Sequence, residues 1–191
     1  MKGSSNSFLI RKSVNDVFAN RLNRKLILMN AKDVIRSTME LSMTVLKSYF
    51  GDMSDAELMT RPGAGCNHLA WQLGHLISSE AGLLKGVCPD AVVDLPAGFA
   101  DQHSKATAGS DDPAKFCTKQ QYIDLFDKVR AVTLAALEKV PEAELDKPGP
   151  ERMRSICPTV GSYFNLIGSH PMMHAGQFVP VRRALGKPVL M

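Results

Sequence analysis

The chain has 191 residues, 45% of them hydrophobic and 22% charged, which is the composition of a globular protein with one full hydrophobic core. It contains no run of eighteen apolar residues, so the sequence predicts no membrane-spanning helix. The net charge of +4 comes from the start of the chain, because residues 1–28 carry +5 and the remaining 163 residues carry −1. We therefore expect the folded body to bind no nucleic acid.

Residues 1–28 are predicted to be a basic N-terminal extension, and residues 29–191 a single domain. The extension lacks the long apolar core and the small-residue cleavage site of a secretory signal. It could be a mobile tail, a short helix packed on the body, or translated sequence upstream of Met29. A further hypothesis is attachment to nucleic acid or a membrane surface through these residues, which their deletion would test at low salt.

The four cysteines are scattered along the chain and form no C-x-x-C pair. This spacing is typical neither of a zinc ribbon nor of a disulfide framework, and it favours a reducing, cytoplasmic location.

The first predicted helix covers residues 31–50, where apolar residues recur at helical spacing. Asn67 is the expected N-cap of a second helix that runs to about Val87. Beside the apolar stripe of this second helix runs a row of polar or small residues, which is typical of a helix that lines a cavity. Gly74 would allow a neighbouring backbone to approach closely. The row consists of His68, Gln72, His75, Ser79 and Gly82.

Residues 88–117 are rich in proline and glycine and are predicted to be a long connection that could bring His103 near a ligand. Thr118 and Gln121 form the capping box of a third helix, which Pro141 ends. The last helix is expected from about Thr159 to Leu185, with a kink or break at Pro171. Four helices with almost no strand signal predict an all-α four-helix bundle.

His170 and His174 are four residues apart in the last predicted helix, so they lie on one face of it. They continue the apolar stripe of that helix, where leucine or isoleucine would be expected. Two buried imidazoles need partners, because an unpaired buried polar group costs on the order of 1–3 kcal/mol. A metal ion would satisfy both, and His75 lies on a near-inner face of another helix. The alternative is three ordinary core or surface histidines.

The segments GHLISSE and HPMMHAGQFVPVRRALGKP together resemble the DinB/YfiT-like family of metal-dependent enzymes over about residues 31–188. This resemblance implies an antiparallel four-helix bundle, often a homodimer, that holds a divalent ion. Carried across residue by residue, it implies the ligands His75, His170 and His174. Pro171 departs from the commonest form of the motif.

Three imidazoles with an open position are expected of a catalytic rather than a structural site. The resemblance implies a metal-dependent thiol S-transferase or hydrolase that acts on a small electrophilic substrate, with a low-molecular-weight thiol as co-substrate. Histidine ligation suits zinc or nickel, with iron or copper as alternatives. The alternative function is a non-catalytic bundle of a stress response that binds metal or a partner, since no clear general acid or base accompanies the histidines.

Other polar residues are assigned less directly. Gln177, one turn beyond His174, could hold the metal-binding face in place or make an ordinary hydrogen bond. His68 could line the pocket but is expected in solvent, and His103 is a candidate fourth ligand. Glu80 is expected to form a salt bridge on its own helix, and Arg182 to lie at a solvated helix end.

Overall fold

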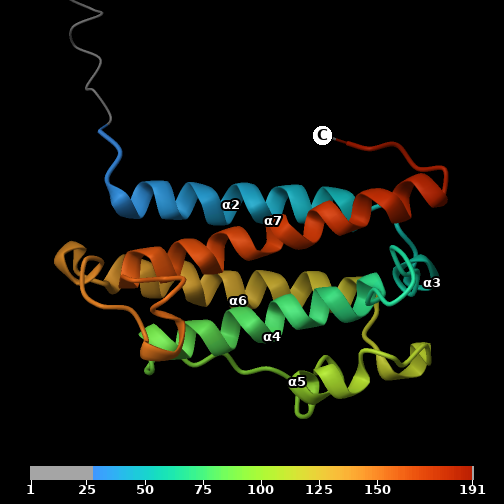
Figure 1. Cartoon of the computed structure of the whole chain (residues 1–191), viewed down its shortest axis with the longest axis horizontal. Helices are drawn as coiled ribbons and strands as arrows, with labels where there is room; N and C mark the ends of the chain where they lie inside the picture. Colours follow the sequence, from blue (N-terminus) through green and yellow to red (C-terminus); the bar gives the residue numbers. More distant parts are fainter. Residues whose placement is uncertain (1–27, 191) are drawn as a thin grey trace, which may run out of the picture.

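A computed structural model describes residues 28–190, and the predictions for residues 1–27 lie outside this range. Two single-turn helices, α3 (Asp55–Leu58) and α5 (Phe99–Gln102), lie in the connections. The described residues contain no strand beyond one isolated bridge, which confirms the all-α bundle. The bundle (Figure 1) is built from four long helices, α2 (Ala31–Phe50), α4 (Leu69–Val87), α6 (Lys119–Lys139) and α7 (Val160–Ala184).

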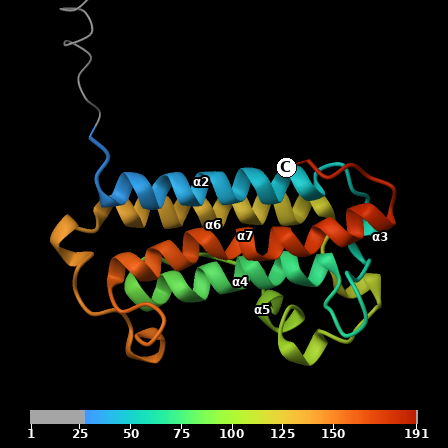
Figure 2. The ribbon, with the colours of Figure 1, turned by 45° about the horizontal axis from the view of Figure 1, so that its top comes forward.

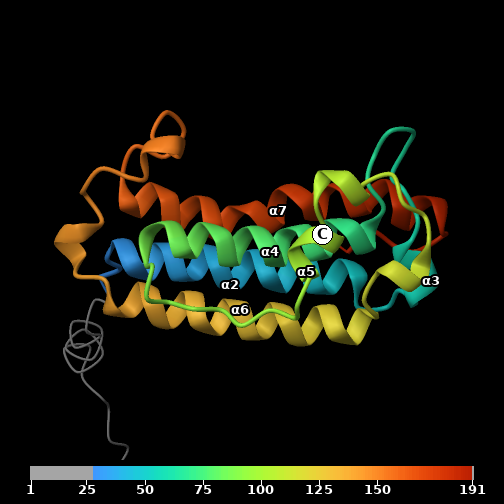
Figure 3. The same cartoon turned by 90° about the horizontal axis from the view of Figure 1, so that it is seen from below.

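Helices α2 and α7 run in one direction, and α4 and α6 run in the other (Figure 2). The start of α2 therefore lies beside the end of α6, where the Lys32 ammonium donates to the Glu138 carbonyl at 2.9 Å. The long connection between α4 and α6 carries the chain back along the bundle (Figure 3), so that these two helices are parallel. The antiparallel pairs are α2 with α6 and α4 with α7. None of the described helices has the length and apolarity needed to cross a membrane.

The helix ends follow local capping chemistry, with one correction. The capping box of Thr118 and Gln121 opens α6 as predicted, and Thr159 opens α7 in the same way. The prediction of Asn67 as the N-cap of α4 is wrong, since His68 takes that position and its Nδ1 accepts from the Trp71 amide at 3.0 Å. An imidazole nitrogen without a proton can satisfy a free first-turn N–H as a carboxamide oxygen does.

Helix α7 continues without a break through Pro171 and also through Pro180. Proline removes one helical hydrogen bond. Pro171 is buried on the face that also buries Ile167 and Phe178, whereas Pro180 is exposed. Of the two outcomes expected at Pro171, the break does not occur.

Three buried charged side chains, Arg182, Glu80 and Arg130, connect the helices. Arg182, expected in solvent, is fully buried, and its guanidinium donates to the Tyr49 carbonyl and to both Asp52 carboxylate oxygens, at 2.6 and 3.1 Å.

Glu80 bonds no residue of its own helix, contrary to expectation, but accepts from Arg130 of α6 at 2.8 Å, with both side chains buried. Arg130 also donates to the Met39 carbonyl of α2. Burial raises the pKa of Glu80, and the charge of Arg130 opposes that rise. These contacts hold α4, which carries His75, against α6 and α2.

Candidate metal centre

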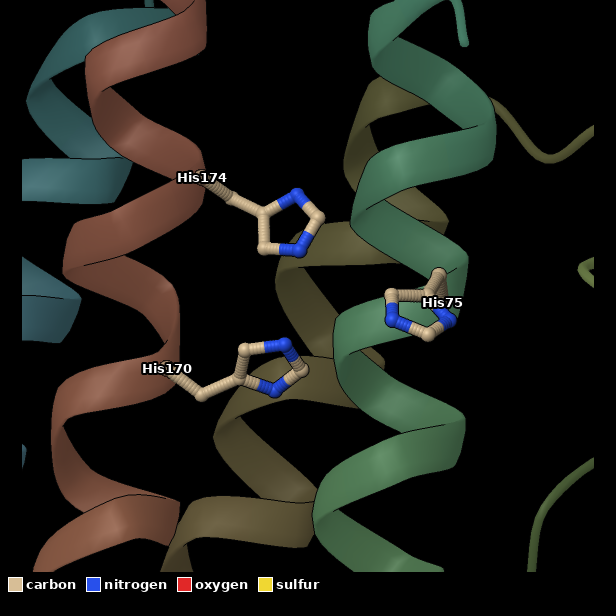
Figure 4. Close-up of side chains that lie close together, drawn as sticks. All are labelled: His75, His170 and His174. Atoms are coloured by element: carbon tan, nitrogen blue, oxygen red, sulfur yellow. The ribbon is translucent and has the colours of Figure 1, made fainter.

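The structure brings His75 of α4 together with His170 and His174 of α7. The two α7 histidines project from successive turns toward α4, where His75 faces them (Figure 4). The centroid of the His75 ring lies 5.5 Å from those of the other two rings, which are 5.0 Å apart. One nitrogen from each ring can be chosen so that all three lie within 4.8 Å of one another. No other cluster of three metal-binding side chains occurs among residues 28–190.

The cluster is electrostatically suited to donate lone pairs. Burial lowers the pKa of His75, and it lowers the pKa of His170 to about 4, with a further contribution from the nearby His75. Burial also lowers the pKa of His174 to about 4, and the two neighbouring histidines add to the shift. All three imidazoles are therefore neutral near pH 7, which is the form that binds a metal.

Gln72 determines the orientation of the His174 ring. The Nδ1–H of His174 donates to the Gln72 carboxamide oxygen at 2.9 Å, and the Gln72 amide donates to the Asn67 carbonyl at 2.8 Å. Because this amide is held at both ends, the proton of His174 stays on Nδ1 and the lone pair of Nε2 is directed away from Gln72. Gln72 thus contacts a candidate ligand and fixes its tautomer.

His75 lies between two residues of its own helix. Trp71, one turn earlier, stacks on its ring with centroids 5.0 Å apart and planes at 6°. Ser79, one turn later, places its hydroxyl 3.4 Å from the His75 Nε2. The stacking restricts rotation of the imidazole, so His75 is held toward α7.

A cavity of about 390 Å³ adjoins the cluster. Its volume is within the range of roughly 300–1,000 Å³ typical of small-ligand pockets. The predicted polar row of α4 contributes to its lining, as expected of a helix beside a cavity. Leu166 and Met173 share the His170 face of α7, a spacing visible in the sequence. Arg152 and Met153 come from the short 3-10 helix Glu151–Met153, which no sequence pattern singled out. The cavity is lined by His75, Ser79, Gly82, Leu83, Arg152, Met153, Leu166, His170 and Met173.

A larger cavity, of about 760 Å³, lies between the ends of α4 and α6 and includes Cys88 and Lys139. None of the five histidines lines it. Chemistry rather than size therefore identifies the candidate site.

Three other predicted site residues lie outside the cluster. His68 is fully buried rather than in solvent, and its Nε2 contacts the Ser110 carbonyl at 3.2 Å. His103 uses both ring nitrogens, on the Phe99 carbonyl at 2.8 Å and the Tyr122 hydroxyl at 2.9 Å, so it has no lone pair left for an ion. Gln177 is exposed and makes no hydrogen bond within residues 28–190.

The close neighbour of Gly74 is the side chain of His103, rather than the backbone that was expected. A Cβ atom built on it would lie 2.0 Å from the His103 ring. The packing of His103 against α4 therefore requires glycine at this position.

The three imidazoles fit a divalent ion. Nitrogens bound to one tetrahedral zinc ion at about 2.0–2.1 Å lie roughly 3.4 Å apart. The three nitrogens here lie within 4.8 Å of one another, so the rings reach that spacing by movements of at most about 1.4 Å. Neutral rings and a fixed tautomer at His174 match the donor set of such an ion. Three protein ligands leave at least one coordination position open.

Comparisons with known proteins agree with this architecture. A sequence model of the DinB superfamily matches residues 39–178. A crystal structure described as that of the conserved protein of locus from Enterococcus faecalis superposes with a TM-score of 0.61 and 18% sequence identity. The match covers 84% of this chain and 100% of that one, and at this identity it shows the fold alone. No curated protein matches the sequence.

Proposed function

The chain belongs to the DinB superfamily, and from this membership and the three-histidine cluster we propose that it is a metal-dependent enzyme acting on a small electrophilic substrate. The reaction is transfer of a low-molecular-weight thiol to the substrate or hydrolysis of the substrate. One observation carries the proposal. Three neutral imidazoles meet beside a cavity, and no further histidine, cysteine or carboxylate among residues 28–190 joins them.

His75, His170 and His174 would hold the ion. A divalent ion bound there would lower the pKa of a thiol or a water molecule at the open position. Zinc or nickel is the ion we expect, with iron or copper as alternatives.

The chain orients the histidines. Gln72 holds the His174 tautomer and Trp71 restricts the His75 ring, and the cavity walls beside them are mainly apolar. In thiol transfer a sulfur–carbon bond forms while the bond from that carbon to the leaving group breaks. The leaving group takes the electron pair, and the thiol proton passes to solvent.

A second candidate function is binding of metal or of a partner without catalysis. It is favoured by the cavity lining, to which the described part of the chain contributes no aspartate or glutamate that could act as a general acid or base. We also keep the homodimer and the cytoplasmic location as proposals. The four free cysteines are in keeping with a reducing compartment.

Metal analysis of the purified full chain tests the proposal, with His174→Ala as the variant and His68→Asn as its control. Asparagine keeps the helix-capping acceptor, so the control removes an imidazole outside the cluster. We expect about one divalent ion per chain in the wild type and the control, and little in His174→Ala. Negligible metal in all three proteins would refute the site.

An activity screen then separates the two functions. Low-molecular-weight thiols are combined with a panel of small electrophiles, using protein that is metal-loaded, metal-stripped or reloaded. Turnover that disappears with the metal and returns with it supports the enzyme. Bound metal without any such turnover favours the second function.

A further inference from the structure

We propose that the cavity beside the histidines binds small molecules with an apolar body and one carboxylate, and that Arg152 is the residue that recognises the carboxylate. This inference rests on the proposed function in taking the cavity as the substrate site. It adds the chemical class of the substrate and a residue that determines specificity.

Among residues 28–190, Arg152 is the only one in the cavity lining that always carries a charge. It is exposed, and no carboxylate among residues 28–190 forms an ion pair with it. By contrast, Arg36, Arg61, Arg130 and Arg182 all have carboxylate partners. The guanidinium is therefore available to bind an anion, and its planar array of donors matches a carboxylate with two parallel hydrogen bonds.

The 3-10 turn that carries Arg152 (Glu151–Met153) lies in a connection that is closed by its own hydrogen bonds just before α7. The Gly149 amide donates to the Pro158 carbonyl at 2.9 Å, and the Cys157 amide donates to the Met153 carbonyl at 2.7 Å. The neighbouring Arg154 bonds back to the Gly149 carbonyl at 3.1 Å. These contacts hold the backbone at Arg152 beside the cavity, so that less conformational entropy is lost when its side chain binds a ligand.

The remaining walls suit an apolar body. Leu83, Leu166 and two methionines also line the cavity. Methionine side chains adapt to irregular apolar shapes. A Cβ atom built on Gly82 meets nothing within 4 Å, so glycine at this position leaves open space that a larger residue would occupy.

The charge balance also favours an anion. Residues 28–190 contribute no acidic side chain to the lining, so a negative ligand meets the positive Arg152 and no repulsion from these walls. A positively charged ligand would instead be repelled by Arg152.

Binding of matched probes tests this inference on the full chain, in both metal-stripped and zinc-loaded forms. The probes are 4-phenylbutyrate and its neutral amide, with affinities measured by titration calorimetry or ligand-observed NMR. The variants are Arg152→Met, which removes the charge, and Gly82→Leu, which fills the cavity. Arg183→Met is the matched control, because Arg183 is exposed on α7 and does not line the cavity.

We expect the metal-stripped wild type to bind the carboxylate at least about fivefold more tightly than the amide, as for an ion pair open to solvent. Arg152→Met should abolish this preference, and Arg183→Met should keep it. Gly82→Leu should weaken both probes.

Three results would overturn the inference. They are no binding of either probe to the wild type, equal binding of both probes, or a carboxylate preference that survives Arg152→Met. A preference present only with zinc and unaffected by Arg152→Met would mean that the ion recognises the carboxylate, which leaves the metal centre intact. Failure of the wild type to bind zinc would count against the proposed function only. The affinities of the two probes for the metal-stripped protein would still report on Arg152.

Discussion

The substitution Gln72→Leu isolates what one buried hydrogen bond contributes to the metal centre. Leucine has a similar size and suits a helix, but it cannot accept the Nδ1–H of His174. The Gln72 side chain is 1% exposed and His174 is 9% exposed, so little water can replace the lost acceptor. The ring then has an unpaired donor and no constraint on which nitrogen carries the proton.

The expected loss can be estimated from this contact. A donor left unpaired in a buried site costs about 1–3 kcal/mol. Removing the hydrogen-bond partner of a ligating histidine typically weakens metal binding 10–100-fold, or about 1.4–2.7 kcal/mol. Because the bond is 2.9 Å long and both groups are buried, we expect a loss in this range for zinc.

The assay is competition for zinc against a chromophoric chelator, with urea unfolding to verify that each variant is folded. Gln177→Leu makes the same chemical change three residues from His174, at an exposed glutamine without a hydrogen bond in the described chain. It should bind zinc as the wild type does. Gln72→Glu keeps an acceptor for the imidazole and should retain or raise the affinity.

The reasoning would be refuted if Gln72→Leu bound zinc like the wild type while remaining folded. It would also be refuted if Gln177→Leu weakened zinc binding and Gln72→Leu did not. That second result would indicate that Gln177, and not Gln72, holds the metal-binding face in place.

Three further predictions concern stability, each measured by urea unfolding. Gly74→Ala should lower the free energy of unfolding by about 1–3 kcal/mol, because the new methyl would collide with the His103 ring, whereas Gly176→Ala, with open space around it, should be neutral or stabilising. Asp52→Asn should lower the free energy of unfolding by about 1–2 kcal/mol, since the buried Arg182 loses its charged partner but keeps its carbonyl acceptors. An unchanged midpoint of urea unfolding would contradict this prediction. In metal-free protein, stability should fall between pH 6.5 and about 4, because burial lowers the pKa of both α7 histidines to about 4 and the unfolded chain therefore binds protons first. Replacing either histidine by glutamine should flatten that decline, and an unchanged slope would contradict it.

Much of the fold was predictable because helix formation is local. The apolar stripe of residues 31–50 and the capping box at Thr118 locate α2 and α6 close to their observed ends. The same periodicity placed His170 and His174 on one face of α7. The prediction failed where a tertiary contact decides, as at Arg182, which was expected at a solvated helix end but is buried against Asp52. At Pro171 the predicted break does not occur.

The sequence by itself determined which residues share a helix face, since that depends only on 3.6 residues per turn. It therefore indicated the histidine pair of α7 and the polar row of α4. Only the tertiary structure decided which faces meet: His75 opposite that pair, Gln72 against His174, and Arg152 beside the cavity. The physical reason is that these contacts depend on how far each helix is rotated and shifted against its neighbours. Packing of the whole core and the course of the long connections set those quantities, and no short stretch of sequence encodes them.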